Sequence, residues 1–260
     1  MYILILWKNH SLRRYNMELY NAMITKTLDS LKSLKGKTWA YNSRKAWKDL
    51  GASELILKSE AAYELGANGL GSANYVCVTS SSDLVSKDQV ILYGPDLDKI
   101  KSDNPFARIV LIRGGVLDGD DDEVYRALKQ IEFSKYHVYP DGYMVRMSPE
   151  NYREQIRVGK KAVKKGISFE TVGYRYIEEY KKDANVVNVT VIFITDPNFN
   201  YAELTENAKK TDKLTSTLCH IMEGLPTDCT VCGLKDVCDE VEGMKELHFG
   251  VGDKGTNEHH

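Results

Sequence analysis

Two near-continuous apolar runs constrain this chain most, because they predict strands that are buried on both faces. The runs are residues 107–112 (ARIVLI) and residues 186–195 (VVNVTVIFIT). A strand that is apolar at nearly every position needs cover on both sides of its sheet, and in α/β proteins helices supply that cover. The two runs therefore indicate the α/β class.

Shorter patterns predict the elements around these strands. Apolar residues at helical spacing, with caps and glycine stops, predict helices over 17–34, 53–66, 150–166 and 168–180 and from about residues 123 and 201. Further strands are expected at residues 75–78 and 90–93, and Pro140-Asp141-Gly142 predicts a hairpin turn between residues 136–139 and 143–147. Together they predict a mixed β-sheet flanked by helices.

Composition and charge limit the possible partners. The formal net charge is −2 and the pI is near 6.3, so there is no basic excess to neutralise the phosphates of a nucleic acid. No apolar run approaches the roughly 20 residues that a membrane span requires. We therefore expect no nucleic-acid partner, no membrane partner and a cytoplasmic location.

Four of the five cysteines lie close together near the C-terminus, at Cys219, Cys229, Cys232 and Cys238. Two thiolates separated by two residues can reach one metal ion or cluster, and glycines nearby permit the turns that such a loop needs. A disulfide framework would require an oxidising compartment, which nothing in the sequence suggests. The pattern predicts a Cys-rich metal loop that binds either a [4Fe-4S] cluster or Zn²⁺. Cys77 lies in a predicted buried strand, so we leave it out of the ligand set.

These patterns divide the chain into four segments. They are an N-terminal helical segment (1–66), an α/β domain (67–218), a cluster-binding loop (219–249) and a polar tail (250–260) that we expect to be disordered. Within the α/β domain, basic residues crowd the predicted helix at 150–166. They could hold an anionic ligand such as a phosphorylated cofactor, or they could form a solvated helix face.

The order of several motifs resembles the middle part of acetyl-CoA synthase, the β component of the carbon monoxide dehydrogenase/acetyl-CoA synthase complex. The matching pieces are ILYGPDL at residues 91–97, the strand at 107–115, residues 156–166, VIFITD at 191–196, and Cys229-Thr230-Val231-Cys232 with Val237-Cys238. They span about residues 88–238. The resemblance implies that Cys229, Cys232 and Cys238 help to hold a [4Fe-4S] cubane.

The sequence also departs from that family. The later Cys-Gly-Cys, which binds the distal nickel in the family, has no counterpart here, so we expect no nickel site. Cys219 must then supply the fourth cluster ligand. Gln155 replaces a tryptophan that the family associates with coenzyme A, whereas Arg157 is kept. The resemblance therefore implies that Arg157 and Lys160 could bind a coenzyme-A-like ligand.

Three functions stay open at this point. The first is an iron–sulfur protein with an electron-transfer or accessory role beside a redox or one-carbon enzyme. The second is an acyl- or acetyl-CoA transferase-type enzyme that uses the cluster and coenzyme A. The third is a structural or interaction protein in which Zn²⁺ on the four cysteines stabilises the C-terminal loop.

Overall fold

The computed structural model describes residues 20–115, 121–146 and 148–222, except for the side chains of 121–125 and 218–222. Within them, strands form a five-stranded sheet in the order β1-β4-β8-β5-β3 and a three-stranded sheet in the order β2-β7-β6. The strands are β1 (Lys37–Ala40), β2 (Ala61–Leu65), β3 (Ser72–Thr79), β4 (Gln89–Tyr93), β5 (Phe106–Gly114), β6 (Tyr143–Arg146), β7 (Gln155–Gly159) and β8 (Val186–Ile194). The helices are α2 (Asn21–Leu31), α3 (Asp121–Phe133), α4 (Lys160–Lys164), α5 (Phe169–Tyr180) and α6 (Tyr201–Met222), with 3-10 turns η1 (Ser43–Lys45) and η2 (Ser134–His137).

The five-stranded sheet confirms the predicted mixed α/β architecture. β3 and β5 are parallel, as are β4 and β8, whereas β5–β8 and β1–β4 are antiparallel. β3 is buried at every position, and β5 and β8 are buried at nearly every position. Near-continuous apolar strands take these central places because helices cover both faces of the sheet. The strands predicted at 75–78, 90–93, 107–112 and 186–195 lie in this sheet.

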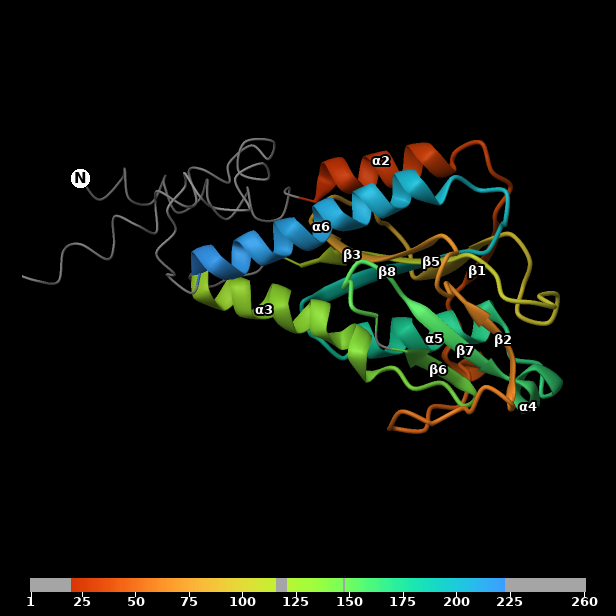
Figure 1. Cartoon of the computed structure of the whole chain (residues 1–260). Coiled ribbons are helices and arrows are strands. Elements are labelled where there is room, and N and C mark those ends of the chain that lie inside the picture. The colour runs from red at the N-terminus through yellow and green to blue at the C-terminus, as the bar shows by residue number, and fades with distance from the viewer. Residues whose placement is uncertain (1–19, 116–120, 147, 223–260) are drawn as a thin grey trace, which may run out of the picture.

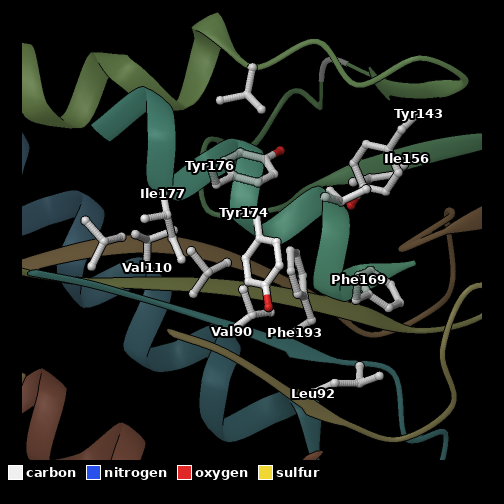
Figure 2. Packing of buried hydrophobic residues seen from close by; sticks show 14 of the residues in the cluster. Val90, Leu92, Val110, Tyr143, Ile156, Phe169, Tyr174, Tyr176, Ile177 and Phe193 are labelled. Carbon is white, nitrogen blue, oxygen red and sulfur yellow. The ribbon is translucent and has the colours of Figure 1, made fainter. Parts of the chain in front are cut away.

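Helices on the two faces of the large sheet give the fold its layers (Figure 1). α2 and α6 cover one face, where Ile24 and Leu204 belong to a buried cluster with Ile109. α5 covers the other face and packs Tyr174 and Ile177 near strand residues that include Val110 and Phe193 (Figure 2). Successive strand residues point to opposite faces, so one strand contributes to both clusters.

Two strands of the three-stranded sheet occupy positions where the sequence analysis predicts helices. The helix predicted over 53–66 is wrong, and of the helix predicted over 150–166 only the last part forms, as α4. Residues 61–65 form β2 and residues 155–159 form β7, and the two strands pair antiparallel. Ile156 and Val158 are fully buried, and Arg157 between them is only partly buried. This is the two-residue period of a strand. Such short segments fit helical and strand periods about equally, and only the pairing partner decides between them.

The predicted hairpin around residues 140–142 forms only in part. The turn is present, because the Tyr143 N–H donates to the Pro140 carbonyl at 2.9 Å, and β6 follows it. The residues before the turn form η2 and a short extended segment instead of the first hairpin strand. β6 therefore pairs antiparallel with β7. This pairing places Tyr143 and Ile156 in the core cluster that contains α5 (Figure 2).

The remaining helix predictions are confirmed. α2 lies within the predicted range 17–34. α3 begins two residues before its predicted start, and α6 begins at its predicted start. α5 begins after Ser168 with a capping box: the Ser168 hydroxyl accepts from the Thr171 N–H, and the Thr171 hydroxyl accepts from the Ser168 N–H, both at 3.3 Å. Such reciprocal bonds satisfy two of the free N–H groups at a helix start.

Across residues 20–115, 121–146 and 148–222, no helix is long and apolar enough to cross a membrane. Most of the predicted cysteine loop and the whole tail at 250–260 lie outside the described residues. The division of the chain into four segments stays a prediction.

Candidate functional site

The predicted metal ligands fall mostly outside the described residues. Cys219 lies in the last turns of α6, and Cys229, Cys232 and Cys238 come after the described part of the chain. Cys77 is fully buried in β3, and burial raises the pKa of its thiol to about 12. A thiol that stays protonated is a poor metal ligand, so the expectation that Cys77 is a core residue is confirmed.

Arg157 and Lys160 lie on different elements and not on one helix. Arg157 is on β7, and its guanidinium donates to Glu64 Oε1 from Nη2 at 2.6 Å and from Nε at 2.9 Å. Its Nη1 donates to the Ile56 carbonyl at 2.6 Å. Lys160 begins α4, is exposed, and donates from Nζ to the Ser59 carbonyl at 2.9 Å. Both side chains thus reach the loop at residues 56–59, and Arg157 already has a carboxylate partner.

A buried ion pair between Arg108 and Glu154 is the most unusual chemical feature of the described core. Arg108 Nε donates to Glu154 Oε2 and Arg108 Nη2 donates to Glu154 Oε1, both at 2.7 Å. The side chains are only 1% and 3% exposed. Tyr176 of α5 lies under the guanidinium, whose carbon is 4.2 Å from the ring centroid. Removing two charges from water is costly, and their attraction offsets this cost only where the two groups contact each other in good geometry.

The electrostatics of the pair keep the Arg108 guanidinium charged, as the direction of its pKa shift indicates. Burial by itself lowers the pKa of Arg108, but the adjacent Glu154 carboxylate outweighs it and places that pKa well above its ordinary value. Burial also raises the pKa of Tyr143 and Tyr176, so both phenols stay protonated near neutral pH. The site therefore offers a fixed guanidinium and neutral hydroxyl groups.

Neighbouring elements position Glu154 through its backbone. The Ser72 hydroxyl donates to the Glu154 carbonyl at 2.7 Å and accepts from the Glu154 N–H at 3.0 Å. Gly66 packs against the same carbonyl with a positive φ of 61°, and a Cβ there would lie 2.2 Å from that oxygen. Only glycine allows this approach, so the turn after β2 sets the place of the carboxylate.

A cavity of about 350 Å³ lies beside the ion pair. Its walls come from residues 53–54, from Asn74 on β3, from Arg108 on β5, and from parts of the segment 135–154. Asn74 and Arg108 are register partners on adjacent parallel strands, so they lie side by side. Arg153 and Tyr143 are among the other polar residues of the wall. A cavity of this size with a few convergent polar groups is typical of a small-molecule site.

The sequence analysis missed this site. The available signal was Arg108 itself, a charged residue inside a run that predicts a buried strand. A buried charge requires a partner, but the partner is 46 positions away along the chain. The helix predicted over 150–166 contains Glu154, and a helical assignment hides its role as that partner.

The fold and the cavity define a mixed α/β protein with a cavity beside a buried ion pair. No curated protein matches this chain. A model of the CO dehydrogenase/acetyl-CoA synthase complex beta subunit family matches residues 51–199, more than half of the 260 residues. The chain belongs to this family, which confirms the resemblance drawn from the motifs. The match covers every residue that lines the cavity and ends before the four clustered cysteines.

Proposed function

We propose that this chain is an iron–sulfur relative of acetyl-CoA synthase with an electron-transfer or accessory role in one-carbon and acetyl-CoA metabolism. Membership of the beta-subunit family carries the proposal. The cysteine pattern that follows the matched region supports it. The family is described as part of a complex, so we also propose an enzyme of the CO dehydrogenase type as the partner.

Cys219, Cys229, Cys232 and Cys238 are the residues that would hold the cluster. A [4Fe-4S] cluster held by four thiolates supplies one-electron transfer. Cys219 lies in α6, a helix that is tied to the core, because Asn207 Nδ2 donates to the Met23 carbonyl of α2 at 3.0 Å. The first ligand would therefore stand on a rigid element, which favours a defined cluster position.

A coenzyme-A-like ligand near Arg157 and Lys160 is the second proposal, and it would suit a transferase. Their common loop at residues 56–59 supports a shared surface. A phosphate would have to compete with Glu64 for Arg157, so the exposed Lys160 would provide most of the attraction. If Lys160→Ala binds coenzyme A as tightly as the unaltered chain does, this proposal is wrong. Lys182→Ala, which changes an exposed lysine just after the end of α5, is the control.

Anaerobic purification followed by metal and sulfide analysis tests the first proposal. We expect about four iron and four sulfide per chain, as in an all-cysteine cubane, and essentially no nickel. The reduced protein should show a one-electron couple and no exchange of carbon monoxide with acetyl-CoA. Stoichiometric nickel with carbonyl exchange would instead make the chain a minimal synthase. Zinc without iron would favour the structural protein, since Zn²⁺ has no redox chemistry.

A further inference from the structure

Exposed apolar side chains gather beside the cavity that adjoins the Arg108–Glu154 pair. Tyr136 and Val145 line this cavity and are 52% and 38% exposed, so it reaches the surface next to them. Phe133 is 56% exposed and contacts Tyr136, with the ring centroids 5.3 Å apart. A hollow that is surrounded by exposed aromatic and aliphatic side chains is typical of a surface that docks another protein.

β6 forms an edge of the small sheet beside this cavity (Figure 1). The Gly159 N–H donates to the Gly142 carbonyl at 2.9 Å, and hydrogen-bonded and non-bonded residue pairs alternate along an antiparallel ladder. By this alternation and the register of β6 with β7, the N–H and the carbonyl of Val145 point away from β7. Neither group has a hydrogen-bond partner among the described residues. The outer edge of β6 therefore offers a free donor and a free acceptor.

The opposite edge of the small sheet is closed, which makes the open edge of β6 distinctive. The Glu64 N–H of β2 donates to Asp103 Oδ1 at 2.7 Å, and the Glu64 carbonyl accepts from the Asn104 N–H at 3.0 Å. No described segment pairs with β6 in this way. β6 also contains no proline, lysine or bulge, the features that discourage pairing at a strand edge. It can therefore accept an extended chain.

The charges around the cavity favour a basic occupant. Glu54 is exposed and forms no ion pair with any described residue, and its Oε2 accepts from the Gly142 N–H at 2.9 Å. A lysine or arginine on the occupant can therefore pair with Glu54. The whole wall has the same bias, because four basic residues line it and, with their ion-pair partners, the carboxylates number five: Glu54, Glu64, Glu132, Glu150 and Glu154.

We infer that β6 and this cavity bind an extended segment of a partner protein by strand addition. The added strand bonds to the N–H and carbonyl of Val145, places an apolar side chain in the cavity and carries a basic residue near Glu54. In strand addition, backbone hydrogen bonds give affinity and a pocket for alternate side chains gives specificity. β6 has only four residues, so the cavity has to supply much of the affinity. The surface contains none of the cysteines, so the inference does not rest on the cluster.

A random heptapeptide library displayed on phage, selected on the full chain, tests the inference. The selected peptides are synthesised and titrated by calorimetry. We expect apolar residues at alternate positions and a neighbouring lysine or arginine, because successive side chains of a strand face opposite sides. Methylation of one backbone nitrogen at a time should weaken binding about fivefold, the effect of one hydrogen bond, at every second position only. The insensitive positions are the matched control within each peptide.

Three variants of the chain assign the binding to this surface. Val145→Pro removes the outward N–H, which the sheet does not use, so the fold should persist and peptide binding should weaken about fivefold. Tyr136→Ser removes an exposed apolar side chain from the cavity wall and should also weaken binding. Val187→Ser is the matched control, because Val187 of β8 is 39% exposed and does not line the cavity. Circular dichroism checks that each variant is folded.

Several results would overturn the inference. Enrichment of no peptide would leave the cavity to a small molecule. Peptides that tolerate methylation at every position, or that bind Val187→Ser and Tyr136→Ser equally weakly, would exclude strand addition at β6. A chain that sediments as a dimer and becomes monomeric in Val145→Pro would assign the edge to a second copy instead of a partner. Iron analysis of the same samples separates these outcomes from failure of the cluster proposal, since peptide binding is expected with or without iron.

Discussion

At the scale of single residues, Arg108 shows how one charged side chain shapes a core. It interrupts an apolar strand, yet it is among the most completely buried side chains of the described protein. The bidentate contact with Glu154 and the Tyr176 ring replace the water that the guanidinium loses. A charged residue in a buried strand is thus tolerated, and Arg108 also lines the cavity.

The first prediction concerns this pair. Arg108→Ala or Glu154→Ala alone should lower the free energy of unfolding by about 3–5 kcal/mol, because each leaves an uncompensated buried charge. The double variant Arg108→Met/Glu154→Leu should cost much less than the sum of the two. Lys182→Ala, which breaks an exposed pair with Glu179, should cost less than about 1 kcal/mol. Urea unfolding measures all four, and a double variant as costly as the sum would contradict the argument.

The second prediction concerns the cysteines. Replacing Cys219, Cys229, Cys232 or Cys238 with serine should abolish iron binding, because a hydroxyl is a poor substitute for a thiolate ligand. Cys77→Ser is the control and should keep the iron, since Cys77 is buried in β3 on the large sheet. Iron content after anaerobic reconstitution is the measurement. Loss of iron in Cys77→Ser together with its retention in Cys219→Ser would show that the ligand set is wrong.

At the scale of elements, the small sheet depends on the turn that follows β2. Gly66 ends that strand, and the next residues lead into β3 of the large sheet. The turn therefore connects the two sheets while it holds the Glu154 backbone in place. Its geometry affects both the fold and the cavity.

The third prediction separates the two constraints on Gly66, namely its positive φ and its close contact with the Glu154 carbonyl. Gly69→Ala should cost about 1–2 kcal/mol of stability, because φ is +83° and a Cβ would meet nothing within 4 Å. Gly66→Ala should cost clearly more, because the added methyl also collides with the Glu154 carbonyl. Equal losses in thermal or urea unfolding would mean that the contact with Glu154 is unimportant.

At the scale of the whole molecule, many tyrosines are enclosed in the core. Burial raises the pKa of Tyr75, Tyr176 and Tyr201 above the ordinary value near 10. The pKa of Tyr174 is raised to about 12, first by burial and then by its hydrogen bond to Glu170. In the unfolded chain these phenols would ionise normally.

The fourth prediction follows from this difference. Below about pH 10 the tyrosines are protonated in both states and do not alter stability. Above it the unfolded state loses protons first, so the free energy of unfolding should fall by about 1.4 kcal/mol per pH unit for each such tyrosine. Tyrosine absorbance and circular dichroism followed from pH 8 to 12 should show delayed ionisation that coincides with unfolding. Ionisation near pH 10 without unfolding would contradict the burial.

The sequence by itself determined the central strands, most helices and the family. The runs at 107–112 and 186–195 are too apolar to be stable outside a covered sheet, and the Ser168 cap defines a helix start through local bonds. These features depend on residues that are close together in the sequence, so they can be recognised from the sequence alone. The cysteine pattern likewise predicts a metal site, which stays a prediction.

Only the tertiary structure decided the small sheet and the cavity. Residues 61–65 and 155–159 are too short for their period to distinguish helix from strand, and they became strands because they pair with each other. The partnership of Arg108 with Glu154, the place of Arg157 beside Glu64, and the cavity wall around Asn74 all join distant parts of the chain. Their energies depend on burial and on exact partners, which exist only once the layers have packed.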